Sequence, residues 1–112
     1  MAVSDYAAGK VVTTVPIGAG TDGAGFDPGT GDAFASNADG TLTIIHQDTP
    51  DTYHVAQTLK TMTGSRNLGL DPVSHATFLA GAKFEAPAAG APAGRRPAMT
   101  PGSFVVLVVE RK

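Results

Sequence analysis

The chain has 112 residues, of which 42% are hydrophobic and 16% charged, and its formal net charge is −2. This length and composition predict one small globular domain with a modest core. The near balance of acidic and basic side chains excludes the electrostatic signature of a nucleic-acid partner or an anionic membrane surface. The absence of cysteine excludes disulfides, thiol nucleophiles and Cys-ligated metals.

The chain also carries no signal for export or membrane insertion. Its first ten residues have neither the basic start nor the apolar stretch of a signal peptide. The longest apolar run, Phe104–Val109, is far shorter than a membrane span. We therefore expect no membrane partner and assign no compartment. Two interpretations stay open, an intracellular protein or a chain that has lost its original beginning.

Short β-rich runs, separated by turn residues, follow one another along the chain. Residues 1–5 resemble the tail of a strand, and further strands are predicted at 9–17, 23–27, 33–37, 41–48, 54–61, 67–71, 76–81 and 103–110. Asp39-Gly40, between two such runs, is a strong signal for a hairpin turn. The chain has 14 glycines and 8 prolines, and no stretch has a sustained apolar period of 3.6 residues. The pattern predicts an all-β fold.

The sequence contains an internal repeat with a period of 44 residues. Eight of the 28 positions from Val11 to Ala38 are identical after a shift of 44, where unrelated segments would share roughly two. The run GFDP that begins at Gly25, for example, recurs as GLDP at Gly69. A period of 40–50 residues made of short strands is typical of β-propeller blades.

The second copy contains an insertion of alanine, proline and glycine. The run at residues 39–48 has its counterpart at residues 101–111, about 62 positions on, which implies roughly 18 extra residues. This insertion, placed at residues 85–101, is predicted to be a flexible or extended loop. Its Arg95-Arg96 pair is expected to aid solubility rather than to bind a partner.

Strand composition suggests which strand is innermost in each blade. The innermost strand of a propeller blade borders a narrow channel, so small residues suit it, and the runs around Gly25 and Gly69 fit that place. The next strand in each copy carries one aromatic residue. We predict that these residues, Phe34 and Phe78, are equivalent and buried in the core.

A family resemblance accompanies the repeat. The chain resembles the YVTN-type β-propeller repeat. That repeat has a strand GKVVATIPVG and a later run DP.TG.VYVAN..DGTVSVID. The corresponding runs of this chain are GKVVTTVPIG, GFDPGTGDAFASNADGTLTIIHQD and LDPVSHATFLAGA. The resemblance covers nearly everything outside the Ala/Pro loop, although His75 stands where glycine is usual. It implies four-stranded antiparallel blades, about two per chain. Family members are typically seven-bladed binding or scaffold proteins, often exported, and relatives with a similar fold include lactonases.

The blade count predicts the organisation of the chain. Residues 1–112 form one two-blade segment, in which 1–17 supply the leading strand or strands of a shared blade, 18–62 the first blade and 63–112 the second. Two blades cannot close a ring. The second blade lacks its outermost strand, and the N-terminus carries an extra strand of that type. We therefore expect either a piece of a larger propeller or a homo-oligomer.

In the homo-oligomer, the strand at residues 10–17 pairs with residues 104–109, within the chain or from a neighbour. Whole two-blade subunits give only even numbers of blades, so three subunits would make six blades and four would make eight. A single open chain would leave apolar sheet faces uncovered. The trimer is the favoured assembly.

Propeller geometry places any ligand site at the mouth of the channel. The candidate residues at this rim are Asp22, Asn37, Arg66 and Asn67. Asp22 and Arg66 occupy equivalent places in the two copies, so opposite charges would alternate around the rim. Mutual neutralisation without any ligand is the other possibility that the residues leave open.

Other motifs favour structure over chemistry. His46, His54 and His75 do not have the spacing of metal ligands. The aspartates lie mostly at turns, where this side chain bonds its own downstream backbone, and no serine lies in a nucleophile elbow. We therefore expect no catalytic residue, no metal and no cofactor.

Two functions from different classes remain. The first is a non-enzymatic propeller module for binding or scaffolding, which completes its propeller by self-association or with the missing blades of a larger propeller. The alternative is a fragment of a lactonase-like hydrolase, which would need acidic or histidine groups gathered in the channel.

Overall fold

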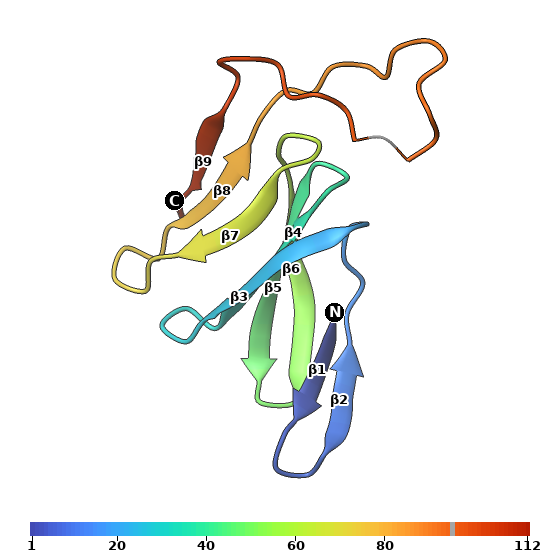
Figure 1. Ribbon diagram of the computed structural model, residues 1–112. Helices are drawn as coiled ribbons and strands as arrows, with labels where there is room; N and C mark the ends of the chain where they lie inside the picture. The colour runs from blue at the N-terminus through green and yellow to red at the C-terminus, as the bar shows by residue number, and fades with distance from the viewer. Residues whose placement is uncertain (95) are drawn as a thin grey trace.

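The computed structural model of the protein describes residues 1–94 and 96–112, which form three antiparallel sheets (Figure 1). The N-terminal sheet consists of β1 (Ala2–Asp5) and β2 (Lys10–Thr14). The central sheet consists of β3 (Thr21–Asp27), β4 (Asp32–Asn37), β5 (Thr41–Thr49) and β6 (Thr52–Lys60), and the C-terminal sheet of β7 (Arg66–Leu70), β8 (Thr77–Gly81) and β9 (Val105–Val109). In each sheet the strands pair in chain order.

The all-β prediction is confirmed, since no helix occurs in the described parts of the chain. It follows that those parts include no helix long and apolar enough to cross a membrane. The predicted hairpin turn is also present. Gly40 adopts a φ of 88°, which only glycine reaches at low cost, and the Asp39 carboxylate accepts a hydrogen bond of 3.1 Å from the backbone N–H of Thr41.

The 44-residue repeat is visible in the pairing of the strands. Phe34 on β4 lies opposite Gly25 on β3, and Phe78 on β8 lies opposite Gly69 on β7. In both sheets a glycine therefore lies opposite the aromatic residue. The two phenylalanines are therefore equivalent in register, as predicted.

A β-bulge repeats as well. In the central sheet the bulge follows the pair Ile44–Gln57 and leaves Ala56 on β6 without a partner. In the N-terminal sheet the bulge follows the pair Val3–Thr13 and leaves Val12 on β2 without a partner, 44 positions before Ala56. Because a bulge marks a definite place in a ladder, the β1–β2 hairpin is the counterpart of the β5–β6 hairpin.

The insertion lies between β8 and β9. Val109 lies opposite Thr77 as Ile45 lies opposite Ala33. The shift from residue 45 to residue 109 is therefore 64 positions rather than about 62. A bridge between Phe84 and Met99 closes the base of the loop. Beyond it the chain extends away from the sheets (Figure 1), and Arg95 of the predicted Arg95-Arg96 pair lies outside the described residues.

The core lies between the central and C-terminal sheets. Its buried members are Phe34, Leu42 and Leu79, and half-buried hydrophobic side chains pack around them: Ile44, Leu59, Leu68, Leu70, Leu107 and Val109. Phe34 is only 6% exposed, which confirms its predicted burial. The prediction that Phe78 is equally buried is wrong, since this side chain is only half-buried.

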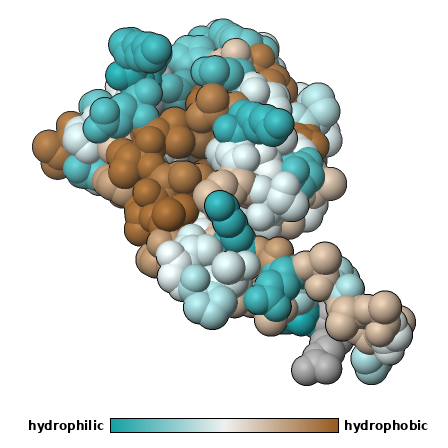
Figure 2. Space-filling model, turned by 90° about the horizontal axis from the view of Figure 1, so that it is seen from above, coloured by the Kyte–Doolittle hydropathy of each residue, from teal (hydrophilic) through white to brown (hydrophobic). Residues whose placement is uncertain are grey.

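The reason is the alternation of side chains along a strand. Leu79 points toward the central sheet, so its neighbour Phe78 points to the opposite face of the C-terminal sheet. That outer face also carries Val106 and Val108, which are 54% and 55% exposed. Seen from above, it forms an apolar patch on the surface (Figure 2).

The pairing of β2 within the chain differs from one of the predicted alternatives. β2 pairs with β1, and the N-terminal amine extends this ladder with a bond of 2.6 Å to the carbonyl of Val15. β9 pairs with β8, and no second partner of β9 lies in the described parts of the chain. Pairing of β2 with β9 inside one chain is therefore not found, because β1 already occupies the edge of β2.

Candidate functional site

The structure brings together two of the four predicted rim residues. The Asp22 carboxylate accepts a hydrogen bond of 2.7 Å from the backbone N–H of Asn67, which connects the first strands of the central and C-terminal sheets. Asn67 has a φ of 58°, a conformation that asparagine tolerates better than most residues. Arg66 lies beside it with an exposed side chain. These predicted rim residues form a contact between sheets.

Asn37 has a different role from the other three residues. Its side chain is fully buried, and its amide nitrogen donates to the hydroxyls of Thr41 and Thr43, both at 3.1 Å. Its amide oxygen accepts from the hydroxyl of Thr21 at 3.0 Å. Since both ends of the amide have partners within the sheet, Asn37 fixes the end of β4 and has little capacity left for a ligand.

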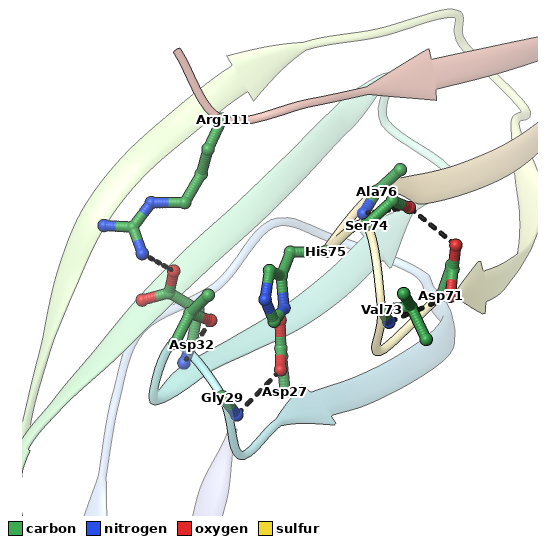
Figure 3. A network of polar contacts seen from close by, with 10 residues as sticks. Asp27, Gly29, Asp32, Asp71, Val73, Ser74, His75, Ala76 and Arg111 are labelled. Atoms are coloured by element: carbon green, nitrogen blue, oxygen red, sulfur yellow. Dashed lines mark hydrogen bonds and ion pairs between the residues drawn. The ribbon is translucent and has the colours of Figure 1, made fainter.

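A second polar site lies at the opposite end of these strands, at the turns from β3 to β4 and from β7 to β8. A pocket of about 650 Å³ opens there between the central and C-terminal sheets. Its polar lining includes Asp32, His46, His75, Thr77 and Arg111. Figure 3 shows that Asp32 and Arg111 face each other there and that His75 reaches toward Asp27.

His75 and Asp27 connect the two sheets at this site. Nδ1 of His75 lies 2.7 Å from a carboxylate oxygen of Asp27, and the other oxygen accepts from the backbone N–H of Gly29 at 2.9 Å. The Asp27 side chain is 1% exposed. Burial by itself would raise the pKa of Asp27, but the bonds from His75 and Gly29 outweigh it and hold the pKa below its ordinary value.

The backbone of His75 is strained. Its φ is 62°, in the left-handed region that costs an ordinary residue about 1 kcal/mol or more. The equivalent position in the first copy is Gly31, which has a φ of 73°. Gly29 makes room for the ring, because a Cβ on Gly29 would lie 2.7 Å from Cε1 of His75. The chain therefore holds an imidazole at a position suited to glycine.

His46 and Asp32 form a second pair of the same kind. Nδ1 of His46 lies 2.7 Å from a carboxylate oxygen of Asp32, whose side chain is 8% exposed. The other Asp32 oxygen lies 3.5 Å from Nη1 of Arg111. A third pair, His54 with Asp48 at 2.6 Å, is more exposed, and the His46 and His54 rings meet edge to face with centroids 5.8 Å apart.

The His75–Asp27 and His46–Asp32 pairs, whose carboxylates are buried, orient an imidazole in the same way. A carboxylate only accepts hydrogen bonds, so Nδ1 carries the hydrogen and Nε2 is left for a further partner. Such an arrangement can bind a polar ligand or accept a proton. In the described parts of the chain, no group of three or more His, Asp or Glu side chains is placed to hold a metal ion.

The sequence interpretation missed these pairs. The spacing of the three histidines along the sequence does not reveal these pairs, because each histidine meets an aspartate from another strand or turn rather than another histidine. One signal was available, namely His75 in place of the glycine found at Gly31 in the first copy.

Known proteins provide no further assignment of this site. The chain matches no protein-family model, and the comparisons with curated proteins and with solved structures found no match either.

Proposed function

We propose that this chain is a non-enzymatic β-propeller segment that acts as a binding scaffold and completes its blades by association with further copies of itself. One observation carries the proposal. The face of the central sheet that bears Phe34 is covered by the C-terminal sheet, while the equivalent face at Phe78 is open. A contiguous apolar face of this kind marks an interaction surface in soluble proteins.

The repeat also suggests what covers the open face. In the chain itself, Leu70 packs against the cluster around Phe34. The residue equivalent to Leu70 in the central sheet is Phe26, which is 47% exposed. The Phe26 face of a second copy therefore has the right type of side chain, at the right register, to pack on Phe78.

The strand edges support the same partner. β9 is the third strand of its sheet, whereas the central sheet has a fourth, β6. By the 44-residue repeat and the shared bulge, β2 is a strand of the β6 type. β2 of a neighbour can thus supply the missing fourth strand, and whole subunits then give even numbers of blades, with a trimer of six favoured. The missing blades of a longer propeller are the other partner that fits.

The decisive measurement is the mass of the purified chain by light scattering over a range of concentrations. The variant Val108→Glu places a charge on the open face and should abolish association. The matched control is Val73→Glu, since Val73 lies in the turn between β7 and β8 and is 86% exposed. A monodisperse monomer of the unaltered chain at high concentration would refute self-association, as would a Val108→Glu variant that associates normally.

A lactonase-like hydrolase is the second candidate. The observation that favours it is the pair of carboxylate-held imidazoles, since an Nε2 held in this way can accept a proton from water. Hydrolysis of simple lactones by the unaltered chain, lost in His46→Gln, would support this candidate. Equal rates with and without protein would remove it.

A further inference from the structure

The pocket between the central and C-terminal sheets has the size and two-sided lining of a small-molecule site. Its volume of about 650 Å³ lies within the range of known ligand pockets. One wall is apolar, formed by Phe34, Ile44, Leu59 and Val109. The polar end is formed by the turns that carry Asp32 and His75, together with His46 and Arg111.

A buried hydroxyl without a partner lies in this lining. Thr77 is 1% exposed, and its Oγ1 has no hydrogen-bond partner in the described parts of the chain. Leaving a buried hydroxyl unpaired costs free energy. A ligand group in the pocket would supply the partner that the protein does not.

The polar end presents hydrogen-bond donors. Nδ1 of His46 and Nδ1 of His75 are held by buried carboxylates, so each Nε2 is left for a further polar partner. Arg111 makes one contact with Asp32, at 3.5 Å, and a guanidinium has five N–H groups. Glu110 and Lys112, which also line the pocket, carry opposite charges.

The strain at His75 is a further reason to assign a role to this place. A φ of 62° at a position where the first copy has glycine costs stability, and such strained residues cluster at ligand sites. The Asp27 carboxylate that holds the ring is fully buried. The imidazole is thus held at the pocket by its bond to this carboxylate.

From these observations we infer that the pocket binds a small carboxylate ligand with an apolar body. The ligand carboxylate accepts hydrogen bonds from Arg111 and from the hydroxyl of Thr77. Its apolar body packs on the wall formed by Phe34, Ile44 and Leu59. Asp27 and Asp32 are already engaged by His75, His46 and Arg111, so they do not bind the ligand themselves.

Isothermal titration calorimetry with octanoate tests this site, with 1-octanol as the uncharged probe of the same apolar body. Octanoate should bind at least tenfold more tightly than 1-octanol. Arg111→Gln and Thr77→Val should each weaken octanoate binding at least fivefold. Arg96→Gln is the matched control, because Arg96 is an exposed arginine that does not line this pocket, and it should leave the affinity unchanged.

Three results would overturn the inference: no octanoate binding at millimolar concentration, equal affinity for 1-octanol, or unchanged affinity in both Arg111→Gln and Thr77→Val. Loss of folding in Thr77→Val would be recognised by circular dichroism, and Arg111→Gln, near the end of the chain and exposed, then decides. None of these results bears on self-association, which light scattering measures separately.

Discussion

At the scale of single residues, one substitution between the two copies accounts for one of the polar contacts that connect the sheets. Gly31 and His75 are equivalent and share a left-handed backbone, but only His75 carries a side chain that reaches Asp27 of the preceding sheet. The strained backbone at His75 places its imidazole where it bonds to the buried Asp27 carboxylate. Most other residues at the same turns, such as Asp71, only stabilise their own turn.

The pKa of Asp27 predicts how stability depends on pH. In the folded chain this pKa lies below its ordinary value of 3.8. The ionised carboxylate therefore stabilises the fold at pH values above that ordinary value. The contribution is lost as the pH falls through the lowered pKa. Urea unfolding between pH 7 and pH 2 should therefore show stability decreasing below about pH 4, and less steeply in Asp27→Asn.

A control variant separates this effect from general acid denaturation. Asp51→Asn alters an exposed turn carboxylate and should follow the unaltered chain. Some acid dependence will persist in Asp27→Asn, because hydrogen bonds also lower the pKa of Asp39 and of Asp71. Identical acid profiles for Asp27→Asn and the unaltered chain would contradict the prediction.

Burial predicts unequal effects for the two equivalent phenylalanines. Phe34→Ala should cost about 3–5 kcal/mol of unfolding free energy, because it leaves a cavity in the core. Phe78→Ala should cost about 1 kcal/mol in the single chain, because the ring is half-buried, but should weaken association. Thermal unfolding at low protein concentration and light scattering at high concentration measure the two effects. Equal destabilisation of the dilute chain would contradict the structure.

At the scale of elements, β1 and β9 are strands of the same type. Val108 lies opposite Phe78 as Ile44 lies opposite Phe34, so β9 corresponds to β5. The β1–β2 hairpin corresponds to β5–β6, with Val3 in the place of Ile44. Val3 of the same chain and Val108 of a neighbour therefore fit the same position opposite Thr13 on β2. If copies associate, β9 of one copy must either displace β1 of the next copy or pair with the free edge of that β1.

This equivalence predicts a specific cross-link. Residues directly opposite in an antiparallel ladder are close enough for a disulfide, and the chain has no native cysteine. A mixture of Thr13→Cys and Val108→Cys chains should form a mixed disulfide dimer under mild oxidation, whereas Thr13→Cys with the control Val73→Cys should not. Equal yields from both mixtures would mean that β9 does not take the place of β1.

The insertion between β8 and β9 predicts tolerance to deletion. Its base is held by backbone bonds of 2.8 Å from Glu85 to Ala98 and from Thr100 to Lys83, which lie outside residues 88–94. Removing 88–94 should change the free energy of unfolding by less than about 1 kcal/mol, because closure entropy varies slowly with loop length. Loss of soluble, folded protein on this deletion would mean that the loop packs on the sheets.

At the scale of the whole molecule, three sheets in series leave the outer face of the C-terminal sheet and the edge of β9 open. The molecule measures 50 × 31 × 21 Å, which is elongated rather than ring-shaped. Completion by other copies would cover the open face and pair the open edge at the same time. This is why we propose association rather than a catalytic role for the chain as a whole.

We propose that the favoured trimer depends on the ladder of β2. Proline at Thr13, which is paired with Val3, removes a donor from this ladder and should reduce the mass seen by light scattering from three chains to one. Proline at Val12 is the informative control, because Val12 is the unpaired bulge residue and bulges tolerate proline. An assembly with an odd number of blades, or one that survives Thr13→Pro, would contradict head-to-tail strand exchange.

By itself the sequence determined the strands, their turns and the 44-residue repeat, because these depend on side-chain alternation and turn chemistry over a few neighbouring residues. Only the tertiary structure decided that His75 meets Asp27, 48 positions away, and that His46 meets Asp32. Such contacts depend on strand register and on how one sheet packs on the next, which no local pattern encodes. The half-exposed state of Phe78 has the same cause, since the burial of a residue is set by the sheet that covers it rather than by the sequence around it.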